Sequence, residues 1–264
     1  MSSAPAASVA TADPAVPALE ITDLSLAIGA ARIVSGVNLS IHDGEFLGLI
    51  GPNGAGKTSL LNLLSGLLAP TAGSIHLHGK SMDNLAPHQR ARAGLGRTFQ
   101  SSDLFPALSV LENVRLAAQA RMGGSMRLWR RADRATRPLH AAWENMERVG
   151  LAPRAGALAG TLSHGEKRKL ELAILLAGEP AVFLLDEPMA GVSAEDVPAL
   201  TALIGELCAE RGATAIMVEH HMDVVLALAD RLAVMHHGAL LACDTPAAVM
   251  ANQTVQAAYV GEAL

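Results

Sequence analysis

The sequence Gly51-Pro52-Asn53-Gly54-Ala55-Gly56-Lys57-Thr58 determines how the rest of this 264-residue chain is interpreted. It matches the pattern Gly-x-x-x-x-Gly-Lys-Ser/Thr. Residues 45–50 before it (Glu-Phe-Leu-Gly-Leu-Ile) have the composition of a buried strand, and residues 59–65 after it begin a helix. A strand, a glycine-rich loop and a helix in this order predict a phosphate-binding P-loop.

The P-loop residue types suit a polyphosphate ligand. Backbone N–H groups at the start of a helix hold phosphate, and the glycines adopt the required backbone angles while keeping side chains away from the ligand. We expect Lys57 to contact the β- and γ-phosphates and the Thr58 hydroxyl to ligate Mg²⁺, with Ser59 completing the loop's contacts. A glycine-rich turn that binds nothing is the less favoured alternative, because Lys-Thr follows the last glycine directly.

Overall composition limits the classes of protein. The chain has 20 Lys and Arg against 25 Asp and Glu, a formal net charge of -5, which does not suggest a nucleic-acid partner. Cys208 and Cys243 lie far apart without metal-ligand spacing and indicate a reducing compartment. Charges interrupt every long apolar run, so we expect no membrane-spanning helix. Residues 1–17 lack the basic start of a signal peptide and are expected to form a disordered leader, which predicts a cytoplasmic protein.

A second pair of functional residues follows the apolar run 181–185, which ends in Asp186-Glu187-Pro188. A carboxylate at the end of a buried strand beside a P-loop can hold Mg²⁺ through its water shell, and we assign this role to Asp186. Glu187 is one residue further on, and we hypothesise that it polarises the attacking water as a general base. A merely solvated strand end is less favoured, because two carboxylates after five apolar residues are costly to place without a function.

Apolar periodicity predicts an α/β protein with a parallel sheet, an antiparallel sheet layered on it, and a helical insertion. Beyond those named above, the expected strands are 19–21, 24–26, 32–34, 37–41, the edge strand 74–79, 213–218, and the hairpin 231–235 with 239–242. The expected helices are the insertion over about 108–149, 194–210, and a terminal helix over 246–259.

Two clusters of titratable residues each allow a structural and a functional interpretation. His76 and His78 would share one face of the edge strand, and a metal pair is conceivable, but a solvated face is favoured because no third ligand is apparent. The arginines between Arg121 and Arg137 are most simply a solvated helix face, with a basic patch that touches lipid or a partner as the functional alternative.

A further motif extends the interpretation. Leu162-Ser163-His164-Gly165-Glu166 resembles the Leu-Ser-Gly-Gly-Gln signature of ABC transporter ATPases, placed shortly before the 181–186 strand. Phe99-Gln100 resembles the family's Q-loop, residues 190–193 its D-loop, and His220 its switch histidine, and all occur in the family's order. The resemblance covers residues 19–264. It implies a RecA-like P-loop NTPase core with an antiparallel β subdomain, an ABC ATPase domain over 18–264, a helical signature subdomain over about 101–170, and a helical tail over about 246–264.

The resemblance also implies cofactors and partners. ATP and Mg²⁺ would bind between two ABC ATPase subunits, identical or related, so that Ser163, Gly165 and Glu166 of one subunit reach the γ-phosphate on the other's P-loop. Gln100 would contact Mg²⁺ and the attacking water, and His220 would reach the γ-phosphate. Alone, a histidine at a strand end is most simply structural, and its neighbours favour the catalytic reading.

Within the family the chain is most similar to ATP-binding subunits of branched-chain amino acid importers, through residues 96–100, 116–149, 218–223 and 259–264. This implies integral membrane permeases, a periplasmic solute receptor, and a place on the cytoplasmic face of the membrane. Urea and amide importers carry similar subunits, often with a histidine at the position of His164. The more distant alternatives are a small-molecule kinase, which leaves residues 162–166 unexplained, and a non-transport ABC ATPase acting on ribosomes or DNA.

One position departs from the family. ABC ATPases usually stack adenine on an aromatic side chain of the first sheet, and Ile28 occupies that position here, without a Tyr or Trp nearby. Apolar contact would replace stacking, so we expect loose discrimination between purine bases.

Overall fold

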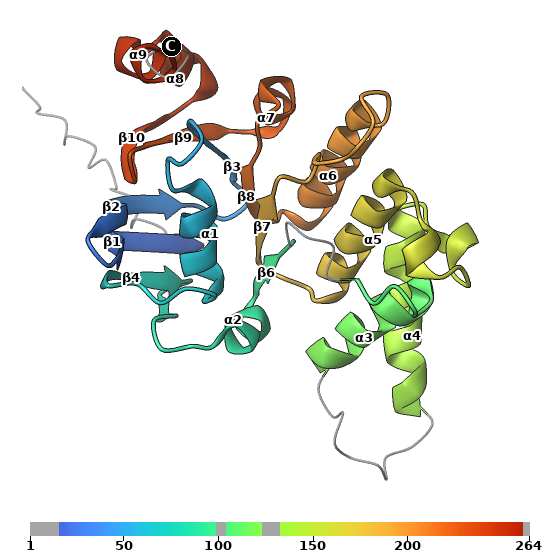
Figure 1. The fold of residues 1–264 in the computed structure, drawn as a ribbon. Coiled ribbons are helices and arrows are strands. Elements are labelled where there is room, and N and C mark those ends of the chain that lie inside the picture. Colours follow the sequence, from blue (N-terminus) through green and yellow to red (C-terminus); the bar gives the residue numbers. More distant parts are fainter. Residues whose placement is uncertain (1–15, 99–103, 123–132, 261–264) are drawn as a thin grey trace, which may run out of the picture.

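The computed structural model describes residues 16–98, 104–122 and 133–260. Its centre is a six-stranded sheet in which β3, β6, β7, β8 and β9 run parallel to one another and β10 pairs antiparallel with β9 at one edge (Figure 1). In spatial order the strands are β10 (Ala239–Asp244), β9 (Arg231–His236), β3 (Phe46–Ile50), β8 (Thr214–Val218), β7 (Val182–Asp186) and β6 (Leu95–Arg97). Helices cover both faces of the parallel part, which explains why β3, β7 and β8 are apolar throughout.

The predicted antiparallel sheet is confirmed, but its strands are longer than expected. The order is β2 (Ala31–Ile41), β1 (Leu19–Ile28), β4 (Ala72–Leu77) and β5 (Lys80–Ser81). The four short strands expected over 19–41 were wrong, because the polar interruptions are bulges within two continuous strands: the register shifts between Ile21 and Leu24, and Asp23 and Gly36 have positive φ.

The strand at 74–79 was also expected at a sheet edge, and this is wrong because β5 pairs outside β4. Its strand alternation ends at Leu77, and His78 adopts a left-handed turn with its Nδ1 3.7 Å from Asp43 Oδ1. The shared strand face of His76 and His78 is therefore not formed. Within the described ranges, no group of three or more His, Cys, Asp or Glu residues could hold a metal.

Helix α1 (Lys57–Ser65) lies between the two sheets (Figure 1). It begins two residues earlier than predicted. Its four leucines at positions 60, 61, 63 and 64 belong to one buried cluster with residues of β1, β2 and β3. The P-loop is thereby anchored on both sides, since the helix that follows it is buried against two sheets.

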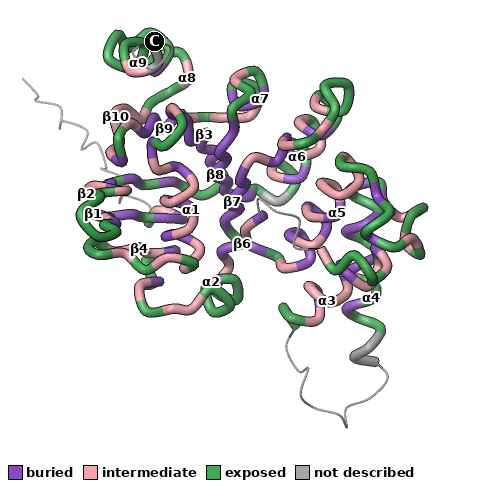
Figure 2. The backbone as a smooth tube through the Cα atoms, in the orientation of Figure 1, coloured by how far each residue is buried: buried purple, intermediate pink, exposed green. Residues whose placement is uncertain are grey.

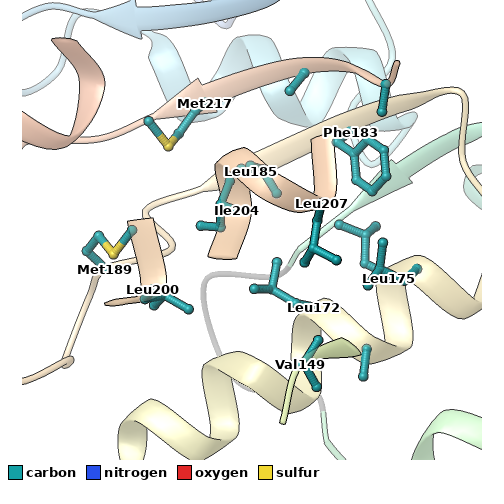
Figure 3. Close-up of a cluster of buried hydrophobic side chains, with 14 of the residues drawn as sticks. Val149, Leu172, Leu175, Phe183, Leu185, Met189, Leu200, Ile204, Leu207 and Met217 are labelled. Atoms are coloured by element: carbon teal, nitrogen blue, oxygen red, sulfur yellow. The ribbon is translucent and has the colours of Figure 1, made fainter. Parts of the chain in front are cut away.

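The helical insertion is confirmed as α3 (Val110–Met122) and α4 (Asp133–Arg148), which pack against α5 (His164–Ala177) on the side of the central sheet away from α1 (Figure 1). Leu172 and Leu175 of α5 meet Phe183 and Leu185 of β7 in a second buried cluster (Figure 3). The same cluster includes Leu200, Ile204 and Leu207. This core holds α5 at a set position relative to the end of β7.

The remaining described helices are α2 (Pro87–Ala93), α6 (Val197–Arg211), α7 (Met222–Leu228), α8 (Pro246–Ala251) and α9 (Gln253–Val260), with single 3₁₀ turns at Ala152–Arg154 and Ala159–Thr161. The single terminal helix expected over 246–259 was wrong. Asn252 ends α8, and its side chain accepts the Thr254 N–H at the start of the next helix, so the chain turns there.

Burial is concentrated along the central strands and the facing sides of α1 and α5, while the outer surfaces are exposed (Figure 2). No helix in the described ranges is long and apolar enough to cross a membrane. The predicted leader lies outside the described residues except for residues 16 and 17, as do three of the six arginines of the cluster between Arg121 and Arg137, namely Arg127, Arg130 and Arg131.

Candidate functional site

The P-loop connects β3 to α1, as the sequence predicted. Its first and last glycines have φ of 148° and 99°, and the close packing around them excludes a side chain. A Cβ at Gly51 would lie 2.1 Å from the Met235 carbonyl oxygen, and one at Gly56 would lie 2.8 Å from the Ile33 carbonyl oxygen. Both positions therefore require glycine for backbone and packing reasons together.

The loop is also tied to its surroundings by hydrogen bonds. The Gly238 N–H donates to the Ala55 carbonyl at 3.1 Å, which joins the P-loop to the β9–β10 turn. The buried Lys57 ammonium donates to the carbonyls of Gly51 at 2.5 Å and Pro52 at 2.8 Å. A positive charge is therefore held against the loop, and Thr58 and Ser59 follow it in the first turn of α1.

Asp186 ends β7 and is completely buried, with 0% exposure. Burial raises the pKa of its carboxyl group, while the hydrogen bond and charge of Arg97 oppose that rise. The Arg97 Nη2 is 2.8 Å from Asp186 Oδ2, and the Asp186 N–H donates to the Thr98 hydroxyl at 3.1 Å. Among the described residues, Asp186 Oδ1 is buried without a hydrogen-bond partner, and a carboxylate oxygen of this kind suits a hard cation such as Mg²⁺.

Glu187 directly follows β7 and His220 lies two residues after the end of β8, and the two meet at the same edge of the central sheet. Glu187 Oε1 lies 3.2 Å from His220 Nε2. The backbone at Glu187 is left-handed, with φ of 48°, and its N–H donates to the Val218 carbonyl. This turn separates the Glu187 side chain from the preceding Asp186, so the two adjacent carboxylates enter different environments.

Ser163 is the N-cap of α5, as expected for a residue that begins a helix. Its hydroxyl accepts the Glu166 N–H at 3.2 Å, and Glu166 Oε2 accepts the Ser163 N–H at 2.9 Å. This capping box satisfies two N–H groups, and Gly165 lies inside the first turn. This turn lines a cavity of about 110 Å³ together with Val192 and Asp196. The site at the start of α5 therefore lies beside the segment after β7.

The described ranges do not include every residue that the sequence predicted for the site. Phe99 and Gln100 lie outside the described residues, so the Q-loop assignment remains a prediction. Sequence reasoning also missed two buried charged residues beside the site, Arg97 and Glu219. Their positions in the sequence were the available signal. Arg97 is a lone charge directly before Thr98, and Glu219 is a charge between an apolar strand and His220.

Comparison with known proteins identifies this arrangement. A family model described as ABC transporter matches residues 34–190. The chain belongs to the ABC transporter family. This ABC chain is 38% identical over 255 residues to the high-affinity branched-chain amino acid transport ATP-binding protein BraF of Pseudomonas aeruginosa, covering 94% of this chain and 99% of that relative. It is 36% identical over 254 residues to the corresponding LivG protein of Escherichia coli K12, covering 94% and 99%.

Solved structures agree with this family. An ATP-binding cassette of an ABC transporter in its ADP conformation has a TM-score of 0.80 and 28% identity, covering 92% of this chain and 98% of that one. A dimeric cassette bound to ADP and Pi in a post-hydrolysis state has a TM-score of 0.72 and 25% identity, covering 86% and 98%. The ABC chain is thus an ATP-binding, ATP-hydrolysing protein with a P-loop NTPase fold.

Proposed function

We propose that this ABC ATPase is the ATP-hydrolysing subunit of an importer for branched-chain amino acids and drives transport through separate membrane permeases. The observation that carries the proposal is similarity over nearly the full length of two ATP-binding proteins named for that transport. The protein would lie on the cytoplasmic face of the membrane and serve a periplasmic solute-binding protein indirectly. We further propose one ABC ATPase domain over 18–264, with a helical subdomain over about 101–170 and a tail over about 246–264.

In this proposal two ATPase subunits enclose ATP between the P-loop of one and the start of α5 of the other. The solved dimeric cassettes among its structural neighbours support a paired arrangement. The N–H groups at the start of α5, around Ser163 and Gly165, suit an anion, and the capping box with Glu166 keeps that turn ordered. Each subunit then supplies half of each nucleotide site.

Different residues of one subunit would have different roles in ATP hydrolysis. Residues 51–59 would bind the phosphates, with Lys57 as the point charge. Glu187 would orient and deprotonate the attacking water, and His220 would contact the γ-phosphate. Thr58, Asp186 and Gln100 would hold Mg²⁺, which supplies charge neutralisation on the phosphates when bound. Support for this division comes from the 3.2 Å contact between Glu187 and His220 and from Asp186 Oδ1, which has no hydrogen-bond partner in the part of the chain that the structure describes.

An exposed apolar surface supports permease docking. Phe105, Leu108 and Leu158 are exposed in the region between residue 104 and the start of α5. The buried side chain of Asn113 accepts the Phe105 N–H through Oδ1 and donates to the Phe105 carbonyl through Nδ2. The Ala159 N–H donates to the Leu108 carbonyl. The loop is therefore held rigidly while its apolar side chains face outward, as expected of a binding surface.

A urea or amide importer is the second candidate, and His164 in the signature favours it. Uptake of labelled leucine and labelled urea by cells that lack this gene tests both candidates. Restored leucine uptake with the wild-type gene, and none with Glu187→Gln, is the expected result. Restored urea uptake alone would replace the proposed solute.

Co-purification tests the permease partners and the non-transport alternative. We expect integral membrane permeases to be recovered with the wild-type chain and lost with the double substitution Phe105→Ser and Leu158→Ser. Leu226→Ser is the matched control, because Leu226 is also an exposed leucine but lies in α7. Recovery with ribosomes or DNA in place of permeases would contradict the transport function.

A further inference from the structure

Glu219 is a buried carboxylate between β8 and His220, with only 4% of its surface exposed. Its Oε1 accepts the Met189 N–H at 2.7 Å. Its Oε2 accepts the N–H of His220 at 2.9 Å and that of His221 at 3.3 Å, and lies 3.1 Å from His221 Nδ1. One side chain therefore connects the segment that follows Glu187 to the segment that contains His220.

The cost of burying this charge indicates that the connection is specific. A buried carboxylate is unfavourable unless several donors satisfy it. Throughout the described ranges no lysine or arginine pairs with Glu219, and the side-chain group beside its carboxylate is the ring of His221. Backbone N–H groups from two loops supply the other contacts. Those amides belong to Met189, His220 and His221. Met189 is two residues from Glu187, and His220 is itself part of the Glu187–His220 contact.

The Glu187–His220 contact is too exposed to fix the positions of its own two side chains. The His220 side chain is 48% exposed and that of Glu187 is 24% exposed. Ion pairs with this exposure contribute only about 0–1 kcal/mol. The separation of the two side chains must therefore be set by the backbones that carry them, and Glu219 binds both backbones.

The segment after Glu187 is also held from its other side. The Ala190 carbonyl accepts two bonds from the Arg168 guanidinium, at 3.0 and 3.2 Å. Arg168 lies in α5 and pairs with Glu171 at 2.7 Å. Glu219 thus holds the N–H of Met189, and Arg168 holds the carbonyl of Ala190. A change at Glu219 would free the first of these two attachments and leave the second in place.

We propose that Glu219 is a positioning residue for ATP hydrolysis: its carboxylate sets the separation of Glu187 and His220 by bonding Met189 and His220 at once. The inference rests on the roles proposed above for Glu187 and His220. Chemistry explains why a carboxylate is needed. The backbone groups that Glu219 contacts are all donors, and the amide of a glutamine would turn an N–H₂ group toward at least one of them.

Glu219→Gln is therefore the informative variant, because it keeps the shape of the side chain and opposes a donor to a donor. We expect kcat for ATP hydrolysis by the full chain to fall by about 10- to 100-fold through misplacement of the reacting groups. KM for ATP should change by less than about twofold, because the P-loop is unaltered. Amide exchange of the Met189 and His220 N–H groups should become faster.

Glu45→Gln is the matched control. Glu45 is also a buried carboxylate, and it accepts the His42 N–H and pairs with Arg231 away from the Glu187–His220 contact. Both variants lose a buried charge, so both can lose stability, and unfolding by denaturant measures that loss. Equal falls in kcat for Glu219→Gln and Glu45→Gln at equal folded fractions would overturn the inference, since the effect would then be general.

A double-mutant cycle separates this inference from the proposed site. If Glu219 acts through His220, Glu219→Gln should lower kcat by less than about twofold when His220→Ala is already present. Equal losses in both backgrounds would overturn the inference. A fall with His220→Ala but none with Glu219→Gln would overturn it while leaving the site intact. An unimpaired His220→Ala protein would refute the assignment of His220, and the inference with it.

Discussion

The guanidinium of Arg97 lies 2.8 Å from the carboxylate of Asp186, and both side chains are buried. The same guanidinium donates through Nη1 to Asn62 Oδ1 at 2.7 Å and to Ser65 Oγ at 2.8 Å, both in α1. Arg97 thus connects the helix that follows the P-loop to the strand that presents Asp186. A single buried cation keeps the two halves of the nucleotide site together.

Arg97→Met should lower the free energy of unfolding at pH 7 by about 3–5 kcal/mol, because it leaves the Asp186 charge buried without its partner. Burial already raises the pKa of Asp186, and Arg97 opposes that rise. Its removal should raise the pKa further, so protonation at lower pH relieves the unpaired charge and the loss of stability should shrink as pH falls.

Denaturant unfolding of wild type and variant at pH 7 and pH 5 measures this difference. Arg115→Met is the control, because the Arg115–Glu112 pair lies three residues apart on the surface of α3 and should contribute less than about 1 kcal/mol. Similar losses for the two variants, or a loss that does not depend on pH, would contradict the prediction.

Glu187→Gln should lower kcat by about 100-fold or more while ATP binding persists, since a general base typically contributes that much and the residue is outside the P-loop. Glutamine can keep the side-chain length at the left-handed Glu187 position. Single-turnover phosphate release measures hydrolysis, and nucleotide binding is measured separately. Undiminished hydrolysis would exclude Glu187 as the base.

Ser163→Ala should cost about 1 kcal/mol of stability through loss of the α5 cap. Hydrolysis should fall further than that loss explains if, as proposed, the start of α5 serves the partner subunit's nucleotide. Mixing the Ser163→Ala and Lys57→Ala chains provides the decisive measurement: a mixed pair contains one site with both Ser163 and Lys57 intact. Activity above that of either chain alone is expected, and no gain would exclude a shared site.

Ile28→Tyr should tighten ATP binding by about 2- to 10-fold if a ring at this position can stack on adenine. Ile28 is 60% exposed at the end of β1, so a larger side chain has room. Competition between ATP and GTP for wild type and variant measures the change. Strict ATP preference in the wild-type chain would contradict the expected loose discrimination, and Leu226→Tyr controls for added surface aromatic area.

Cys208 should react slowly with thiol reagents in the folded protein at pH 8, because burial raises its pKa from 9.0 to about 11. The unfolded chain releases this proton first as pH rises, so the contribution to stability is lost between about pH 9 and 11. Cys208→Ala should reduce the fall in stability across that interval, measured by denaturant unfolding. Rapid labelling of Cys208 in the folded wild-type protein would contradict the raised pKa of its thiol.

Local patterns predicted many of the described elements. The P-loop, the apolar strands and the start of α5 at Ser163 involve residues within a few positions of one another, where propensity and capping act directly. Predictions failed where the chain is irregular. Bulges at Asp23 and Gly36 have the same polar signature as turns, and the break at Asn252 depends on one side-chain cap.

By itself, the sequence determined that the chain binds ATP, because the P-loop pattern is contained in residues 51–58, and it predicted that these residues and Asp186 hold the nucleotide and its cation. Only the tertiary structure decided which distant residues meet: Arg97 with Asp186, Glu187 with His220, and Glu219 with Met189. The reason is physical. Those contacts depend on the order of β6, β7 and β8 in the sheet, and hydrophobic periodicity specifies that a strand is buried without specifying its neighbour.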